Sequence, residues 1–390
     1  MKRKIFGIVL VLFCLNVYAN DKSVSIKDSA TEGKFDDSKS AIEFVKSMGN
    51  GWNLGNTLDA YGSTKKPDTT LNSQYGWGEA HTTSDIIKFG FENGYKTIRI
   101  PITWFNHISD KKYTINEEWM KRVKTIVNWA MEEGYYVIIN SHHDVRADMK
   151  SPIKYGEGYI IRNNPKDIAE SKAFLTAIWT QICESFNNSY DEHLIFETLN
   201  EPRNAGAADE WFPKKEEEFN LLNDYNKMIL DIIRASGGNN AKRFVMIPSL
   251  CTAMYTTTDN SYFKLPDDSA KDKLILTVHS YIMGVNQNDA DVKFTEESKK
   301  QLTDSFNLLN EKYISKGIPI VIGETASFRN RSYDERIKWV TYQTKLTKKY
   351  GISALYWDTN ANFEWGMGEI ERYSLSINEK EIVDIFLGRK

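Results

Sequence analysis

Eight short apolar runs, separated by longer amphipathic stretches, restrict the fold of this 390-residue chain more than any other feature. The runs are rich in branched and aromatic residues, and they are almost continuously hydrophobic, as strands buried on both faces of a parallel sheet are. They cover Trp52 to Leu54, Thr97 to Ile100, Tyr135 to Ile139, Leu194 to Leu199, Phe244 to Ile247, Leu274 to Val278, Ile318 to Ile322 and Ser353 to Trp357.

The stretches between these runs carry apolar residues three and four positions apart, which predicts amphipathic helices. They include Ile86 to Asn93, Glu117 to Glu133, Lys166 to Asn187, Leu221 to Ala235, Glu296 to Ser315 and Tyr333 to Lys349. Glycines such as Gly134 and Gly351 stand between a helix and the next strand, as helix C-caps do. Strict alternation of eight strands with helices predicts the α/β class and a single (β/α)8 TIM barrel over residues 39–390.

The first residues predict a secretory signal peptide. Lys2 to Lys4 form a basic start, Ile5 to Leu15 an apolar run, and Val17 to Ala19 a cleavage site of the small-residue type. The apolar run is shorter than the about 20 residues that cross a bilayer. We therefore expect residues 1–19 to be removed and the product to be secreted, or periplasmic in a Gram-negative cell. Residues 20–38 are polar and small, which predicts a flexible leader.

Charge and cysteine content restrict the partners. The 53 acidic and 50 basic residues give a formal charge of -3, without the basic excess that nucleic-acid binding requires. We expect no nucleic-acid partner, no membrane partner after signal cleavage, and a monomer. Cys183 and Cys251 are too few for a disulfide scaffold, and the sequence leaves open whether they pair.

In a (β/α)8 barrel, catalytic residues lie at the carboxyl ends of the strands. Polar or aromatic residues stand at nearly every predicted strand end: Asn53, Asn56, Arg99, His142, His143, Asn200, Glu201, His279, Tyr281, Glu324 and Trp357. Two of them are glutamates, and two carboxylates about 5 to 5.5 Å apart are what retaining glycoside hydrolysis requires. The proton donor needs a raised pKa and the nucleophile a lowered one, so we expect Arg99 beside one glutamate and His279 beside the other.

Each of these residues also has a purely structural interpretation. Glu201 precedes a proline and could be a solvated loop residue, while Glu324 follows a glycine and could cap a helix. Arg99 lies within an apolar run, where a structural ion pair inside the barrel is the alternative. His279 could be a buried histidine with its hydrogen bonds satisfied, and Tyr281 could either pack or hydrogen-bond Glu324.

Two further patterns concern ligands. Neighbouring strand residues point to opposite faces, so we expect only one of His142 and His143 to face the pocket, which disfavours a metal centre and favours hydrogen bonding to a sugar. Trp357 ends the last strand, where an indole can form the floor of a pocket for the flat face of a pyranose. Three more tryptophans beside strand ends either extend this platform or anchor loops: Trp77, Trp211 and Trp365.

This ordered set of residues resembles glycoside hydrolase family 5, a (β/α)8 family of retaining β-glycanases. The match centres on Leu194 to Pro202, which reads LIFETLNEP. It continues through Gly51 to Asp59, Ile98 to Pro101, Ser141 to Asp144, His279 to Tyr281, Ile322 to Glu324 and Tyr356 to Asp358. With residues 223–226 and 237–240, the chain is similar to the subfamily of bacterial and anaerobic fungal endoglucanases, whose members cleave cellulose-like β-glucans and often mixed-linkage glucan, xyloglucan or xylan.

The resemblance implies that residues 39–390 are a catalytic domain acting as a retaining endo-β-1,4-glucanase on β-glucan, without a metal or organic cofactor. It implies Glu201 as the acid/base and Glu324 as the nucleophile. It implies a substrate-binding set of Asn53, Arg99, His142, His143, Asn200, His279, Tyr281 and Trp357. Asn200 would bind the sugar 2-hydroxyl, while Arg99 and Tyr281 would support Glu324.

Two segments depart from the family pattern. Thr325 and Ala326 follow Glu324 where Phe-Gly is usual, and residues 72–78 replace a threonine-rich stretch. Both lie near the glycone-side subsites, so the preferred polysaccharide stays open. Two other functions also stay open: a carbohydrate-binding barrel without catalysis, and a metal-dependent hydrolase that uses His142 or His143 on the same fold.

Overall fold

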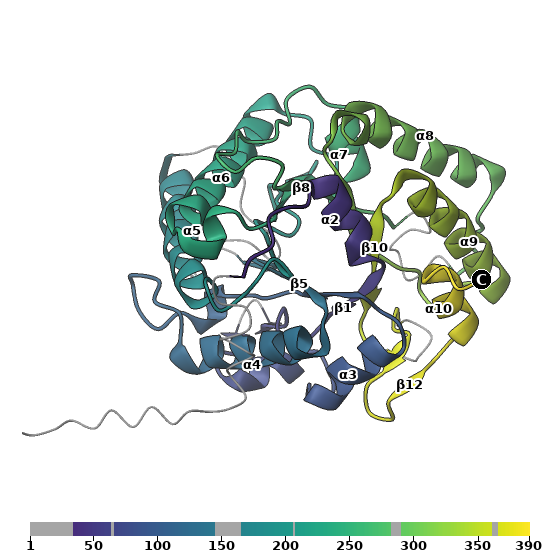
Figure 1. The fold of residues 1–390 in the computed structure, drawn as a ribbon, viewed down its shortest axis with the longest axis horizontal. Helices are drawn as coiled ribbons and strands as arrows, with labels where there is room; N and C mark the ends of the chain where they lie inside the picture. Colours follow the sequence, from purple (N-terminus) through teal and green to yellow (C-terminus); the bar gives the residue numbers. More distant parts are fainter. Residues whose placement is uncertain (1–33, 64–65, 145–164, 206, 282–289, 361–365) are drawn as a thin grey trace, which may run out of the picture.

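The computed structural model describes residues 34–63, 66–144, 165–205, 207–281, 290–360 and 366–390, and its centre is a closed barrel of eight parallel strands (Figure 1). The barrel strands are β1 (Gly51–Leu54), β4 (Thr97–Ile100), β5 (Tyr136–Asn140), β6 (Leu194–Glu197), β7 (Val245–Ala253), β8 (Leu274–His279), β9 (Ile320–Thr325) and β10 (Ser353–Asp358). Each pairs with the next barrel strand along the chain, and β10 pairs with β1. All eight predicted strands, and the TIM-barrel fold, are confirmed.

A ring of helices surrounds the barrel (Figure 1). The helices that follow the strands are α3 (Ser84–Glu92), α4 (Glu117–Glu133), α5 (Pro165–Ser185), α6 (Glu216–Ala235), α7 (Met254–Thr258), α8 (Glu296–Lys312), α9 (Tyr333–Tyr350) and α10 (Lys380–Phe386). Gly134 and Gly351 have positive φ angles of 95° and 66° and end α4 and α9, as predicted. Single helical turns cover η1 (Leu71–Tyr75), η2 (Phe105–His107), η3 (Gly238–Ala241) and η4 (Ile314–Lys316).

One helix that the sequence analysis did not predict, α2 (Ala41–Met48), precedes the first strand and packs against the inside of the barrel (Figure 1). Ser40 and Glu43 form a capping box at its start. Its apolar face joins strand residues in a buried cluster, and the Phe44 ring stacks on Phe244 with centroids 3.7 Å apart. Because β7 begins at Val245, this contact lies at the amino end of the strands. The helix therefore closes the barrel at the end opposite to the strand ends where catalytic residues are expected.

The residues just before α2 also lie against the barrel. Phe35 is buried, with the Lys242 ammonium 5.2 Å and the Arg243 guanidinium 5.7 Å from its ring centroid. Lys273 donates hydrogen bonds to the carbonyl oxygens of Asp37 and Lys39. Residues 34–38 belong to the segment predicted as a flexible leader, whereas the predicted signal peptide and residues 20–33 lie outside the described residues.

Two small hairpins complete the structure, β2 (Gly62–Ser63) with β3 (Lys66–Pro67), and β11 (Ile370–Glu371) with β12 (Ser376–Ile377). The second hairpin follows the last barrel strand and places Arg372 in a buried position beside the loop after β1. The Arg372 guanidinium donates to the carbonyl oxygen and carboxylate of Asp358, to the carbonyl oxygen of Gly55 and to the Thr57 hydroxyl. Arg372 thereby links the loop after the first barrel strand, β1, to the end of the last barrel strand, β10.

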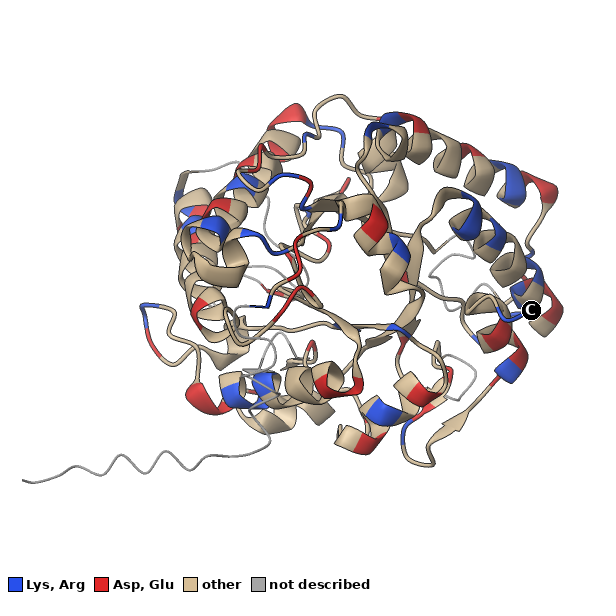
Figure 2. Cartoon of the chain, viewed as in Figure 1, with Lys and Arg blue, Asp and Glu red and all other residues tan. Residues whose placement is uncertain are grey.

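Three features bear on the expectations about charge, membrane association and disulfide pairing. Acidic and basic residues are both distributed over the outer helices in Figure 2. Within the described ranges, no helix combines the length and the apolar character that crossing a bilayer requires. Cys183 and Cys251 are both free and buried, which answers the question of their pairing.

Candidate active site

The two predicted carboxylates meet at the mouth of the barrel, although they come from strands that are not neighbours. Glu324 lies within β9, and Glu201 follows β6 by four residues. One oxygen of each carboxylate and one His279 nitrogen all lie within 4.8 Å of one another. A shift in the pairing of β8 with β9 places His279 directly opposite Glu324. The side chain of Glu324 is 7% exposed and that of Glu201 is 18% exposed, so both are shielded but reachable.

Three side chains fix the carboxylate of Glu324. Arg99 Nη1 donates to Oε1 at 2.8 Å, and the Tyr281 hydroxyl donates to Oε2 at 2.8 Å. His279 Nδ1 lies 3.5 Å from Oε2. Burial and the negative charges of Glu324 and Glu201 raise the pKa of Tyr281 well above its ordinary value, so its hydroxyl keeps the proton that it donates. The donors hold the Glu324 carboxylate in one orientation.

Glu201 is held differently, by His279. Its Oε1 lies 2.7 Å from His279 Nδ1, and its Oε2 lies 4.0 Å from Arg203 Nη1. Burial alone would raise the pKa of Glu201, but the hydrogen bond and charge of His279 outweigh burial and place this pKa below its ordinary value. The pKa of His279 is correspondingly raised, because Glu324 and Glu201 outweigh the effect of burial.

This arrangement partly confirms and partly corrects the expected electrostatics. Arg99 lies beside Glu324 and His279 lies beside Glu201, as expected. The prediction that the donor has a raised pKa is wrong for the unliganded site. The physical reason is the 2.7 Å contact between Glu201 Oε1 and His279 Nδ1, because the hydrogen bond and the charge of His279 outweigh the effect of burial on the pKa of Glu201.

A buried polar layer supports this mouth from below. The Arg99 side chain is fully buried and donates to two carboxylates and two amide oxygens, of Glu197, Glu324, Asn53 and Asn200. Both interpretations of Arg99 therefore hold, because it forms an ion pair inside the barrel and another with the mouth carboxylate. Asn53 is fully buried and also donates to the carbonyl oxygens of Gly323 and Tyr356. In this structure the Asn53 side chain therefore acts through Arg99 and the strand carbonyl groups, and its predicted contact with substrate stays a prediction.

Glu197 and Asn140 are functional residues that the sequence analysis missed. Glu197 Oε2 accepts from Arg99 Nε at 2.8 Å and from Asn140 Nδ2 at 2.8 Å, and Oε1 accepts from the Thr277 hydroxyl at 3.1 Å. The sequence does contain a signal for Glu197. It is a glutamate inside an apolar run, and a buried carboxylate without a partner is energetically costly. Gly323 belongs to the same layer, because a Cβ there would lie 2.8 Å from the Thr277 hydroxyl oxygen.

Replacing Glu197 with Gln is expected to lower the free energy of unfolding by about 3 to 5 kcal/mol, because it removes the charge that compensates a buried guanidinium. Denaturant unfolding measures the change. The matched control is Glu217→Gln, which removes an exposed carboxylate on α6 and is expected to change stability by less than about 0.5 kcal/mol. Equal stabilities of the two variants would show that Arg99 does not depend on Glu197.

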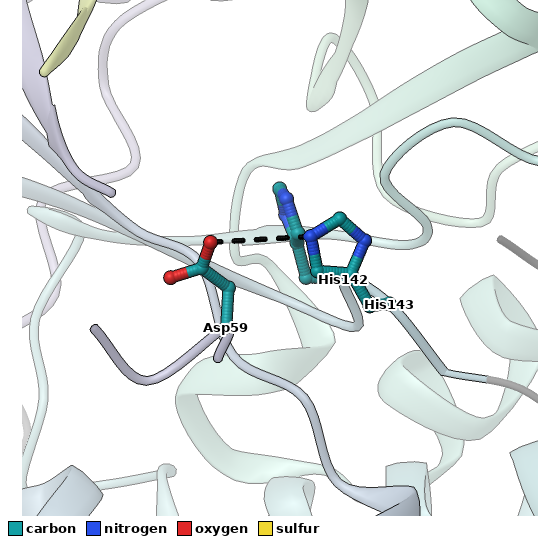
Figure 3. Close-up of side chains that lie close together, drawn as sticks. All are labelled: Asp59, His142 and His143. Carbon is teal, nitrogen blue, oxygen red and sulfur yellow. Dashed lines mark ion pairs between the residues drawn. The ribbon is translucent and has the colours of Figure 1, made fainter. Parts of the chain in front are cut away.

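The adjacent histidines lie close to Asp59, which the loop after β1 supplies (Figure 3). His143 Nε2 is 4.0 Å from Asp59 Oδ2, and the ring centroids of His142 and His143 are 4.3 Å apart. The His142 ring also lies parallel to the Trp357 indole, at 3° and 5.7 Å, and His143 contacts Trp77 edge-on. One nitrogen of each ring and one Asp59 oxygen lie within 4.8 Å of one another, so the two rings approach the same carboxylate instead of pointing to opposite faces. Strand β5 ends at Asn140, so the alternation of strand side chains does not extend to these residues.

The chemistry of this cluster fits hydrogen bonding. Burial lowers the pKa of His142 well below its ordinary value and that of His143 to about 3, so both rings are neutral near pH 7. Burial raises the pKa of Asp59 to about 7, and both of its oxygens already accept backbone N–H groups, of Asn56 and Thr57. Two ligands of one zinc ion at about 2.1 Å lie about 3.4 Å apart. The 4.0 Å separation and the occupied carboxylate therefore fit a metal poorly.

Asn200 and Trp357 border the same space. Asn200 Oδ1 accepts from Arg99 Nη2 at 2.7 Å, which orients its amide nitrogen as a donor for a ligand. The Trp357 indole lies against Gly55, where an added Cβ would come within 3.1 Å of the ring and 2.8 Å of the Asp358 carbonyl oxygen. A glycine is required at this position because the indole occupies the space of a side chain. Of the other tryptophans considered, Trp365 lies outside the described residues.

Replacing Gly55 with Ala is expected to lower about tenfold the kcat/KM of the β-glucanase activity that the sequence predicts, because the new methyl group displaces the Trp357 indole. The measurement is steady-state kinetics of Gly55→Ala, Trp357→Ala and the double variant. If Gly55 acts through Trp357, the double variant is no slower than Trp357→Ala alone. Losses that multiply in the double variant would contradict this reason.

Comparison with known proteins matches the chain to a cellulase family and to endoglucanases. The sequence model described as Cellulase (glycosyl hydrolase family 5) matches residues 58–363. The chain is 37% identical to Endoglucanase A of Clostridium longisporum over 344 residues, which are 87% of this chain and 63% of that protein. It is 36% identical to Endoglucanase B of Ruminococcus albus over 356 residues, covering 89% of this chain and 80% of that one.

Two solved structures share the fold closely. A GH5-4 broad specificity endoglucanase from Ruminococcus champanellensis, with bound cellotriose, has a TM-score of 0.80 and 31% identity, covering 91% of this chain and 99% of its own. A glycoside hydrolase 5 lichenase variant from Caldicellulosiruptor sp. F32, in complex with cellotetraose, has a TM-score of 0.81 and 32% identity, covering 90% and 95%. Both were solved with cello-oligosaccharides bound.

Proposed function

Since the chain belongs to the cellulases of glycoside hydrolase family 5, we propose that it is an endoglucanase that hydrolyses internal β-1,4 bonds of glucans with retention of configuration. The single observation that carries the proposal is the approach of the Glu201 and Glu324 carboxylates to within 4.8 Å. Retaining enzymes hold their carboxyl groups about 5 to 5.5 Å apart, whereas inverting enzymes need about 6.5 to 9.5 Å to admit a water between them.

In the first step, Glu324 attacks the anomeric carbon of the bound sugar while the glycosidic C–O bond breaks. Glu201 donates its proton to the departing oxygen, and a covalent glycosyl ester of Glu324 forms. Arg99 and Tyr281 hold Glu324 in line for this attack. The proton comes from the His279–Glu201 pair, so His279 ends this step neutral and hydrogen-bonded to the Glu201 carboxylate.

In the second step, the Glu201 carboxylate removes a proton from a water molecule, which attacks the anomeric carbon and releases Glu324. The two inversions together retain the β configuration. Positive charge develops on the sugar ring in both transition states, and the Glu324 carboxylate stabilises it. His279 hydrogen-bonds Glu201 during this step as well. At the end of the cycle, Glu201 has regained the proton that it donated in the first step.

The groups around Trp357 suit the sugar on the glycone side of the broken bond. The Asn200 amide nitrogen can donate to a hydroxyl next to the anomeric carbon, and the neutral His142 and His143 rings can donate or accept. The Trp357 indole offers a flat apolar face to the pyranose. These groups suit a pyranose unit, and because the similar solved structures hold cello-oligosaccharides, we propose cellulose-like glucan, mixed-linkage glucan and xyloglucan as substrates.

We also propose that the protein is exported and acts as a monomer. The basic and apolar pattern of residues 1–19 supports export, and a polymeric substrate outside the cell is consistent with it. Mass spectrometry of the protein from culture medium, with a mature end at Asn20 expected, would test export. A retained leader of 19 residues would contradict it.

Reducing-sugar release tests the function itself. The protein is incubated with carboxymethyl-cellulose, barley β-glucan, xyloglucan, xylan and glucomannan, with and without a chelator. We expect release from β-1,4-linked glucans, a rapid fall in viscosity that marks internal cleavage, and the same rate in chelator. Binding of the glucans without release of reducing ends would favour a carbohydrate-binding barrel, and loss of activity in chelator would favour a metal-dependent hydrolase.

A further inference from the structure

Strand β7 carries a strained bulge just before it ends. In the pairing of β7 with β8, the five steps from Pro248 to Ala253 lie opposite only two steps of β8. Within this bulge, Cys251 and Thr252 have φ angles of 55° and 51°, in the left-handed region that residues other than glycine rarely adopt. A β-branched residue such as Thr252 is especially disfavoured there. Strained backbone of this kind persists only where the surroundings hold it, and it concentrates at functional sites.

The bulge holds the chain on both sides of Glu201. The pairing of β6 with β7 ends four residues before Glu201, so the strand ladder does not fix this residue. Instead, the Thr252 hydroxyl donates to the carbonyl oxygen of Asn200, directly before Glu201. The Cys251 N–H donates to the carbonyl oxygen of Pro202, directly after Glu201, at 2.9 Å. The two strained residues thereby hold the peptide groups that flank the acid/base residue.

The same bulge also places the partner of Glu201. Ala253 follows Thr252 and pairs with His279 of β8. His279 Nδ1 in turn lies 2.7 Å from Glu201 Oε1. Thr252 therefore lies between a hydrogen bond to the Glu201 segment and the strand pairing with His279. Its side chain is fully buried, and its hydroxyl is engaged by a backbone carbonyl oxygen, so it acts through these neighbours.

We propose that Thr252 is a positioning residue for the acid/base, whose hydroxyl bond holds Glu201 in reach of both His279 and the departing sugar oxygen. Proton transfer requires donor and acceptor within hydrogen-bond distance, and a displacement of about 1 Å can lower a rate by about 10²-fold. The strain in the bulge is then the cost of aiming the hydroxyl at the chain beside Glu201. The proposal rests on the proposed function.

The nucleophile is held by other contacts. Arg99 and Tyr281 donate to the Glu324 carboxylate, and Arg99 also donates to the side-chain amide oxygen of Asn200 at 2.7 Å. Neither donor belongs to the bulge. Loss of the Thr252 hydroxyl is therefore expected to disturb proton transfer by the acid/base and to leave the nucleophile in place.

Thr252→Val tests this division, because it removes the hydroxyl and keeps the β-branch. We expect it to lower kcat on barley β-glucan by about 10- to 100-fold and to keep KM within about threefold. β-Cellobiosyl fluoride has a leaving group that needs little protonation, so its first-turnover fluoride release measures attack by Glu324. This release is expected to stay within about twofold of the wild type. Thr252→Ser keeps the hydroxyl and is expected to keep glucan turnover within about threefold of the wild type.

Thr97→Val is the matched control. Thr97 is also fully buried in a barrel strand, β4, and its hydroxyl donates to the carbonyl oxygen of Met48 at 2.8 Å. This bond lies at the amino end of the barrel, because Thr97 is the first residue of β4. Denaturant unfolding is expected to show similar losses of stability in Thr97→Val and Thr252→Val. Only Thr252→Val is expected to lose glucan turnover.

Each other outcome counts against the proposal. Thr252→Val that keeps more than about half of the wild-type kcat would overturn it, and so would first-turnover fluoride release that falls as far as glucan turnover. Thr252→Ala lacks the β-branch, so it is less strained and serves if Thr252→Val does not fold. Failure of both to fold, with Thr97→Val folded, would make the bond a requirement for folding and would also overturn the proposal. A wild type that releases neither reducing sugar nor fluoride would instead overturn the proposed function.

Discussion

Replacing Glu324 with Ala is expected to lower kcat on β-glucan by about 10⁴-fold or more, because the nucleophile is the one group without which neither step proceeds. Added azide tests whether Glu324 is the nucleophile. In the space left by the carboxylate, azide attacks β-cellobiosyl fluoride directly, and this single inversion yields an α-glycosyl azide. Nuclear magnetic resonance of the product distinguishes the α from the β anomer.

The structure also indicates how Glu324→Ala affects folding. Glu324 neutralises part of the charge of Arg99, which stays paired with Glu197 at 2.7 Å after the substitution. We therefore expect Glu324→Ala to fold, and thermal unfolding checks this. A folded variant that keeps more than about one per cent of wild-type activity, or that yields a β-azide, would show that Glu324 is not the nucleophile.

Replacing Glu201 with Ala is expected to lower kcat on β-glucan by about 10²- to 10⁴-fold, because the departing sugar oxygen then lacks a proton donor. The loss depends on the leaving group. Fluoride needs little protonation, so β-cellobiosyl fluoride still forms the Glu324 ester, which then accumulates because no base activates water. A burst of fluoride followed by slow turnover is the expected result.

Azide again separates the roles, with the opposite product. It attacks the accumulated ester without a base, so it accelerates turnover of the Glu201→Ala variant and gives a β-glycosyl azide after two inversions. The wild type, treated with the same azide concentration, serves as the control and is not accelerated. Absence of both the burst and the azide acceleration would contradict the assignment of Glu201 as acid/base.

How much of this site the sequence predicts depends on whether a residue acts alone or through partners. The strand ends follow from hydrophobic periodicity, so Glu201, Glu324 and Trp357 could be placed at one mouth without a structure. The need of Arg99 for a counter-charge could also be inferred. That Glu197 supplies it could not, because pairing between strands depends on register, which the sequence of one strand does not specify.

The remaining errors have other origins. The alternation rule for strands was applied to His142 and His143, which lie beyond the end of the strand, where the chain turns freely. The raised pKa expected for Glu201 followed from its role as proton donor, and the hydrogen bond and charge of His279 lower this pKa instead. Helix α2 was missed because eight residues provide too few turns to show a period.

The hairpin after the last barrel strand has a consequence for how small a working enzyme can be. All eight strands are complete at Asp358, so a chain cut there would still satisfy the topology of the fold. It would lack Arg372, whose guanidinium bonds Gly55 and Thr57, the loop on which the Trp357 indole rests. The strand topology alone therefore does not define the catalytic unit, and an engineered truncation or domain fusion should join the chain beyond this hairpin.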